Sequence, residues 1–256
     1  DEIIYSQYGF IVYPLISQAL NAKRVEIPAK NYGNDLPAFL KAITPNTKLI
    51  YIANPNNPTG SFSSAVEIAD FLAQVPPQVI VALDEAYVEF TEPSERVDSF
   101  GLLVKYPNLI VCRTISKAYG LAGLRIGYAV SSTEIAGLLN RVRQPFNCNS
   151  LALAAATAAI QDDEFVAKVA ENNRIGLQLL QNFFDEKDLR YVPSKGNFVM
   201  LDLQQPAAPI YQALLRKGVI VRPLAGYGLP NHLRISIGLP EENQRFLTAL
   251  SEILGI

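Results

Sequence analysis

The sequence predicts an α/β protein in which a mostly parallel sheet forms a large domain with helices on both faces, followed by a small C-terminal α+β domain. Three observations predict this fold. Apolar runs of strand length alternate with segments of helical periodicity over the first part of the chain. These runs are continuously apolar, which is typical of parallel strands covered on both faces. After one long helical segment, the pattern changes to short strands with two further helices.

The elements of the large domain follow from these patterns in order. Strands are expected at residues 2–6, 23–28, 47–55, 78–87, 108–114 and 125–131, and helices at residues 10–21, 65–75, 100–106, 134–143 and 150–163. Ser63 or Ser64 can cap the helix at 65–75, because a serine side chain accepts hydrogen bonds from the free amides of a first helical turn. Pro76 and Pro77 end that helix, since proline has no amide hydrogen to donate.

A long helical segment at residues 164–187 connects the large domain to the small one. After it, strands are expected at residues 189–193, 196–203, 218–224 and 232–238, with helices at residues 210–218 and 241–255. We place the boundary inside the long helix. The large domain then takes residues 1–165 and the small domain takes residues 166–256.

Composition excludes several classes of function. The 256 residues are 49% apolar and 18% charged, which describes a folded globular protein rather than a disordered one. A net charge of −2, with acids and bases interspersed, argues against nucleic acid as the main partner. No apolar run has the length of a membrane span and no signal peptide is recognised, so we expect a cytoplasmic protein. His232 is the only histidine, which excludes a multi-histidine metal site, and we expect it to be structural.

Polar side chains follow three consecutive strands of the predicted parallel sheet. They are Asn54, Asn56 and Asn57 after the third strand, Asp84, Glu85 and Tyr87 after the fourth, and Thr114, Ser116 and Lys117 after the fifth. In open parallel sheets, ligands bind outside the carboxyl ends of the strands. Each group by itself is also explained by turn formation or helix capping. Together, on successive strand ends, they predict one binding site.

The residue types at these strand ends suit an aldehyde cofactor, pyridoxal phosphate. The amine of Lys117 can bind an aldehyde covalently, and its pKa should be lowered by burial and by neighbouring cations. Asp84 can keep the pyridine nitrogen of the cofactor protonated, so that the ring withdraws electrons. Glu85 should point to the other face, because neighbouring strand residues alternate. Asn57 and Tyr87 can donate hydrogen bonds to the ring oxygen.

The phosphate of such a cofactor needs hydroxyls and a cation. Thr114 and Ser116 supply hydroxyls, and Arg125 supplies a planar guanidinium that matches phosphate oxygens. Glycines in the same stretch let the backbone approach a ligand closely. The stretch from Arg113 to Tyr128 therefore predicts the phosphate end of the site.

The chain resembles the fold-type I, pyridoxal phosphate-dependent aminotransferases, and more narrowly the histidinol-phosphate aminotransferases. The motifs are NPNNPTG at residues 54–60, LDEAYVEF at 83–90 and RTISKAYGLAGLRIGY at 113–128. The resemblance implies transfer of an amino group between histidinol phosphate, or imidazole acetol phosphate, and 2-oxoglutarate or glutamate, in histidine biosynthesis. It also implies a cytoplasmic homodimer that binds small-molecule amine and keto-acid substrates, and neither nucleic acid nor membrane.

The resemblance assigns roles to single residues. Lys117, Asp84 and Tyr87 match catalytic positions. Arg234 matches the arginine that binds the substrate carboxylate, and Arg222 matches the position that binds the substrate phosphate in the histidinol-phosphate subfamily. Tyr8 matches an aromatic residue that stacks on the cofactor ring, and the cofactor-binding set is Tyr8, Asn57, Asp84, Tyr87, Thr114, Ser116, Lys117 and Arg125. The alternatives are a core tyrosine at 8 and surface arginines at 222 and 234.

Three other functions stay open on the sequence. The chain could be an aminotransferase for aromatic or other small amines, or a phosphothreonine decarboxylase of the same fold. The third alternative is a non-catalytic sensor domain that binds the cofactor within a transcription regulator. That reading expects a basic helix-turn-helix segment, which these 256 residues do not contain.

The related aminotransferases have a segment before the point at which this chain starts. It contains a glycine-containing loop whose amides bind the cofactor phosphate. This chain starts at Asp1, without methionine and inside a strand-like run, so we expect that an N-terminal segment is missing. We therefore expect weak cofactor binding, little or no activity of this chain by itself, and self-association through uncovered apolar surface.

Overall fold

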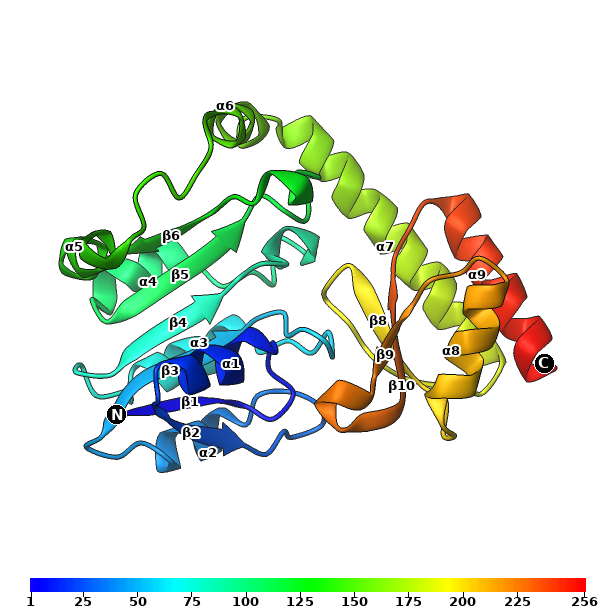
Figure 1. Cartoon of the computed structure of the whole chain (residues 1–256), viewed down its shortest axis with the longest axis horizontal. Coiled ribbons are helices and arrows are strands. Elements are labelled where there is room, and N and C mark those ends of the chain that lie inside the picture. Colours follow the sequence, from blue (N-terminus) through cyan, green and yellow to red (C-terminus); the bar gives the residue numbers. More distant parts are fainter.

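The computed structural model describes residues 1–256 and contains two β-sheets, each with its own helices (Figure 1). The larger sheet has the strand order β2-β1-β3-β4-β5-β6. Its strands are β1 (Glu2–Ser6), β2 (Lys23–Ile27), β3 (Thr47–Ala53), β4 (Ile80–Asp84), β5 (Leu109–Thr114) and β6 (Gly127–Ser131). The first five strands are parallel and β6 is antiparallel to β5, which confirms the prediction of a mostly parallel sheet.

Helices cover both faces of the larger sheet because successive strand residues point to opposite sides. Ile4 belongs to a buried cluster with side chains of α2, α3 and α4, whereas its neighbours Ile3 and Tyr5 contact α1 on the other face. These helices are α1 (Val12–Ala19), α2 (Leu36–Lys41), α3 (Ala65–Leu72) and α4 (Ser99–Lys105). Leu83 belongs to the first cluster, so the next residue, Asp84, points to the face that α1 covers.

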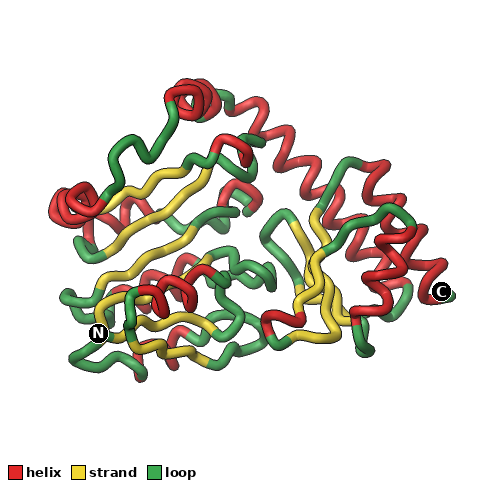
Figure 2. The backbone as a smooth tube through the Cα atoms, viewed as in Figure 1, coloured by secondary structure: helices red, strands yellow, loops and turns green.

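The smaller sheet is antiparallel, with the strand order β7-β8-β10-β9. Its strands are β7 (Arg190–Val192), β8 (Phe198–Asp202), β9 (Arg222–Leu224) and β10 (Leu229–Ser236). The remaining helices are α5 (Thr133–Val142), α6 (Ser150–Ala159), α7 (Asp163–Glu186), α8 (Ala207–Arg216) and α9 (Pro240–Leu254). The long helix α7 starts beside the larger sheet and reaches the smaller one (Figure 2), where α7, α8 and α9 bury one face of it.

The helix α2 was not predicted from the sequence, because its six residues are too few to show a helical period. Its start nevertheless has two ordinary signals. Asp35 accepts a hydrogen bond from the amide of Ala38, and Pro37 lies in the first turn. The strand expected at 78–87 is wrong at its end, since the chain turns after Asp84, where the amide of Ala86 donates to the Asp84 carboxylate.

The other predicted elements are present, and Ser64 rather than Ser63 caps α3. The strand expected at 218–224 is limited to β9 (Arg222–Leu224), and the strand expected at 232–238 starts earlier, as β10 (Leu229–Ser236). The domain boundary between residues 165 and 166 stays a prediction. No helix combines the length and the apolar character that are needed to cross a membrane.

The core of the smaller sheet yields a stability prediction. Phe184 of α7 is fully buried, whereas the adjacent Phe183 is half-buried. Phe184→Ala should lower the free energy of unfolding by about 3–5 kcal/mol, because a large cavity is left in a close-packed core. The matched control, Phe183→Ala, should cost less than about half of that. Urea unfolding followed by circular dichroism measures both, and equal losses would contradict the central position of Phe184.

Candidate functional site

The parallel register of the larger sheet places the predicted polar residues at one edge. Ala53 at the end of β3 lies beside Asp84 at the end of β4, and Asp84 lies beside Cys112 of β5. Asn57 follows β3, and Lys117 follows β5. The carboxyl ends of these three strands therefore form the floor of the candidate site, as the sequence predicted.

Asp84 is held by two hydrogen bonds at this edge. The Tyr13 hydroxyl donates to Asp84 Oδ2 at 2.7 Å, and the Ala86 amide donates to Asp84 Oδ1 at 3.1 Å. Burial raises the pKa of the Asp84 carboxyl, while the hydrogen bonds from Tyr13 and Ala86 and the charge of Lys117 act in the opposite direction. The carboxylate is therefore held in place and can face a positively charged group of a ligand.

Lys117 lies close to Tyr87 and makes no hydrogen bond or ion pair within the chain. Its Nζ lies 5.4 Å from the centre of the Tyr87 ring. Partial burial lowers the pKa of Lys117, and the charges of Arg234 and Arg125 lower it further, whereas Asp84 opposes them. Such an amine is neutral more often than an ordinary lysine, and is therefore a better nucleophile and base.

Asn57 and Tyr87 are both buried beside this lysine. Asn57 Oδ1 accepts a hydrogen bond of 2.6 Å from Arg234 Nη1, and so its amide nitrogen is left without a partner. The Tyr87 hydroxyl has no partner either. Burial raises the pKa of Tyr87 to about 12, so the hydroxyl keeps its proton at neutral pH. Both residues can donate a hydrogen bond to the same ligand atom.

The predicted phosphate ligands lie at the end of β5 and in the segment between β5 and β6. The Ser116 amide donates to Thr114 Oγ1 at 3.1 Å, and the Ser116 hydroxyl has no partner in the chain. Arg125 is exposed, has a positive φ of 55°, and donates from Nη1 to the Ala122 carbonyl at 2.8 Å. A common role of Thr114, Ser116 and Arg125 in phosphate binding stays a prediction.

The smaller sheet presents two arginines to the same region. Leu233 and Ile235 of β10 are buried against the helices, so Arg234 between them points to the opposite face. Arg234 lies directly opposite Arg222 of β9. The guanidinium carbon of Arg234 lies 4.9 Å from the centre of the Phe198 ring, while its Nε is buried without a partner. Burial lowers the pKa of Arg234, and the charge of Arg222 adds to this effect.

A cavity of about 570 Å³ opens beside these arginines. Its lining includes Arg222, Arg234, Tyr211 and Tyr227. No acidic side chain lines it, so an anionic ligand would meet two cations and no repelling charge.

Tyr8 lies at the boundary between the two sheets. It is half-buried and stacks on Tyr32, with ring centres 5.8 Å apart. It also packs against a small apolar cluster formed by Met200, Leu224 and Leu229 of the smaller sheet. These contacts do not test whether Tyr8 stacks on a cofactor, and that role stays a prediction.

The free groups of this edge fit pyridoxal phosphate. The Lys117 amine, the Tyr87 hydroxyl and the Asn57 amide nitrogen have no protein partner, and Arg234 Nε is buried and unpaired. A buried donor without a partner is costly, and it is usually explained by a ligand. The amine suits the aldehyde, and the two donors suit the ring oxygen. The Asp84 carboxylate suits the ring nitrogen.

Three residues of this region were missed from the sequence. Tyr13 donates to Asp84, Phe198 lies under Arg234 and meets Tyr87 edge-on at 5.2 Å, and the phenol of Tyr227 raises the pKa of Tyr87. Each was an ordinary apolar or aromatic position in its helix, strand or loop. No signal in the sequence connects them with a site formed by distant segments.

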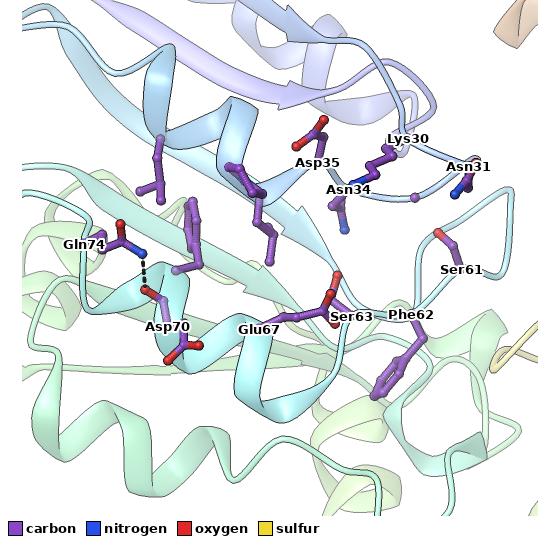
Figure 3. A pocket seen from close by; sticks show the side chains of 15 residues that line it. Lys30, Asn31, Asn34, Asp35, Ser61, Phe62, Ser63, Glu67, Asp70 and Gln74 are labelled. Atoms are coloured by element: carbon purple, nitrogen blue, oxygen red, sulfur yellow. Dashed lines mark hydrogen bonds between the residues drawn. The ribbon is translucent and has the colours of Figure 1, made fainter.

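A second cavity, of about 500 Å³, lies between α2 and α3 (Figure 3). None of the predicted site residues lines it. Two of its carboxylates cap helices: Asp35 caps α2, and Glu67 forms a capping box with Ser64 at the start of α3. Gln74 donates to the carbonyl oxygen of Asp70 at 3.0 Å.

Comparisons with known proteins agree with this geometry. A family model described as aminotransferase class I and II matches residues 1–250. The chain is 77% identical over 256 residues to histidinol-phosphate aminotransferase 2 of Pasteurella multocida, covering 100% of this chain and 70% of that protein. It is 70% identical over 254 residues to histidinol-phosphate aminotransferase 2 of Haemophilus influenzae, covering 99% of this chain and 69% of that protein.

A solved structure of a protein with the same name is also similar to this chain. The crystal structure of histidinol-phosphate aminotransferase from Sinorhizobium meliloti in complex with pyridoxal-5'-phosphate superposes with a TM-score of 0.92 at 30% sequence identity. The match covers 99% of this chain and 70% of that one. This chain therefore spans about seven tenths of the length of these relatives.

The lowered pKa of Lys117 predicts that this lysine destabilises the protein without cofactor. Below its folded-state pKa, Lys117 is charged in both states, and the folded state bears the full cost of its burial and of repulsion by Arg234 and Arg125. Lys117→Met should therefore raise the melting temperature at roughly neutral pH. The gain should shrink as the pH rises from the lowered pKa towards about 10.4, the ordinary lysine value. Thermal unfolding of the unmodified protein and of Lys117→Met across this pH range measures the gain in melting temperature. A gain that grows with pH would contradict the lowered pKa of Lys117.

Proposed function

We propose that this chain, which belongs to the histidinol-phosphate aminotransferase family within the class I and II aminotransferases, transfers an amino group between histidinol phosphate and 2-oxoglutarate. The chain is a pyridoxal phosphate-dependent aminotransferase. The identity of the two substrates, and with it the assignment to histidine biosynthesis, is our proposal. One observation supports it above the others, namely the adjacent arginines Arg222 and Arg234 beside Asn57.

Two adjacent guanidiniums suit a phosphate better than a single carboxylate. A phosphate monoester carries close to two negative charges at neutral pH, and each guanidinium can donate two parallel hydrogen bonds to such an oxygen cluster. Histidinol phosphate has no carboxylate, so its phosphate takes the place that the carboxylate of glutamate or 2-oxoglutarate occupies in the other half of the reaction. Arg234 serves both substrates, and Arg222 adds to the binding of the phosphate.

Pyridoxal phosphate, when bound, supplies an aldehyde that takes up the amine and a ring that withdraws electrons from the carbon that loses its proton. Lys117 Nζ would hold the aldehyde, and as a free amine it would accept that proton. Its lowered pKa favours this role near neutral pH, because the ideal pKa of a catalytic base lies near the working pH. Asp84 keeps the ring nitrogen protonated through its negative charge.

The remaining residues would position the cofactor. Asn57 and Tyr87 donate to the ring oxygen, and the buried Tyr87 stays protonated for this purpose. Tyr8 covers the ring. Thr114, Ser116 and Arg125 would hold the phosphate of the cofactor.

The proposal includes a homodimer in the cytoplasm. The support for self-association is apolar surface on the α5–α6 region, where Val142, Phe146 and Leu151 are largely exposed. Exposed apolar side chains of this size are uncommon on a monomer surface, and they favour an interaction surface here.

The proposed substrate predicts the effect of removing one arginine. Arg222→Ala should raise KM for histidinol phosphate about 10- to 100-fold, the loss expected for one or two hydrogen bonds between charged groups. KM for phenylalanine should stay within about twofold, because this substrate has no phosphate for Arg222 to bind. The matched control is Arg216→Ala, an exposed arginine of α8 that does not line the cavity. Steady-state kinetics on both amines test this.

Other outcomes of the same experiment support the alternatives. An equal loss on both amines would remove phosphate recognition from Arg222. Faster turnover of phenylalanine than of histidinol phosphate by the unmodified protein would favour an aromatic aminotransferase. Release of carbon dioxide from phosphothreonine would favour a decarboxylase.

Covalent labelling tests the assignment of Lys117 directly. Borohydride reduction of the protein loaded with pyridoxal phosphate should attach the cofactor irreversibly to Lys117, because the pKa of this amine is lowered and it has no protein partner. Peptide mapping by mass spectrometry should find the label on the segment that contains Lys117. Lys117→Ala is the control and should abolish it. Labelling mainly of another lysine would remove the assignment.

A further inference from the structure

Tyr13 makes a contact with the site that the proposed function leaves unexplained. Its hydroxyl donates to Asp84 Oδ2 at 2.7 Å across 71 residues of sequence. The side chain is buried, with an exposed fraction of 4%, and its ring stacks on Tyr51 with centres 4.5 Å apart and planes 4° apart. The stacked ring and the helix α1 fix the position of the hydroxyl.

The other groups around Asp84 do not replace this contact. Tyr51 on β3 and Cys112 on β5 lie on the same face of the sheet. Both side chains are uncharged at roughly neutral pH, because burial raises the pKa of both groups, to about 12 for Cys112. Lys117 provides a positive charge but no hydrogen bond to Asp84, and its effect on the carboxyl is the smallest of the four causes. Tyr13 is the only side chain that donates a hydrogen bond to this carboxylate.

We propose that Tyr13 is a positioning residue, whose hydroxyl holds the Asp84 carboxylate ionised and in a fixed orientation towards the ring nitrogen of the cofactor. The inference rests on the proposed role of Asp84. A carboxylate at this buried edge has lost most of its water, which favours the neutral acid. A neutral Asp84 would give the ring nitrogen no negative charge to face, and the ring would withdraw electrons less strongly.

The hydroxyl of Tyr13 is suited to this task because it keeps the proton that it donates. Burial and the charge of Asp84 raise the pKa of Tyr13 well above its ordinary value, so the phenol keeps its proton over the working range. A hydrogen bond to an ionised group is about twice as strong as one between neutral groups. The contact therefore stabilises the charged form of Asp84 and restricts rotation of the carboxylate.

Tyr13→Phe removes the hydroxyl and keeps the ring that stacks on Tyr51. In protein loaded with pyridoxal phosphate that contains nitrogen-15 in its ring, the nitrogen resonance should move from the protonated towards the unprotonated position. The rate constant kcat should fall about tenfold, the size expected when one hydrogen bond to a charged group is lost, while KM changes less than about twofold. A merely structural tyrosine would alter the melting temperature without moving the resonance.

Tyr51→Phe is the matched control, because it removes the hydroxyl of the stacked partner, which has no bond to Asp84. Its resonance and kcat should match those of the unmodified protein. Asp84→Asn separates the two hypotheses. If Asp84→Asn moves the resonance but Tyr13→Phe does not, the positioning role of Tyr13 is refuted and the role of Asp84 stands. If neither variant moves it, the proposed role of Asp84 fails, and the inference about Tyr13 fails with it.

Discussion

The parallel alignment of β3, β4 and β5 is the constraint on which the site depends. Parallel strands end at the same edge, so residues that are far apart in the sequence become neighbours without any further folding. Asp84, Asn57 and Lys117 come from three such ends. An antiparallel arrangement would place the middle group at the opposite edge of the sheet. The strand order therefore decides that a carboxylate, an amide and an amine can meet one ligand.

Buried positive charge without a counterion is a feature of this edge. Glu85, on the far side of β4, forms an ion pair with Arg113 at 2.8 Å, which is how a buried charge is ordinarily accommodated. Lys117 and Arg234 have no such partner, and burial lowers the pKa of both. Uncompensated charges cost stability, and they are retained where a ligand supplies the missing anion. These two buried cations without partners support the proposal that this edge binds anionic ligands.

Contacts between the two sheets complete the arrangement. The hydrogen bond from Arg234 to Asn57, at 2.6 Å, joins a residue of the smaller sheet to a loop of the larger one, and the Phe198 ring meets the Tyr87 ring nearby. Arg234, the proposed substrate ligand, is therefore in direct contact with Asn57, the proposed donor to the cofactor ring. Because Asn57 accepts from this arginine, its amide nitrogen is oriented away from it and is free to donate.

The sequence by itself determined the alternation of strands and helices, the parallel sheet, and the candidates Asp84 and Lys117 at strand ends, because periodicity and turn residues are local properties of the chain. It also determined that Arg234 points away from the apolar core of its strand. Only the tertiary structure decided which groups meet. The partners Tyr13 and Asp84 are 71 residues apart, and Asn57 and Arg234 are 177 residues apart. A period shows which face a side chain occupies, whereas its neighbour on that face depends on how distant segments pack together.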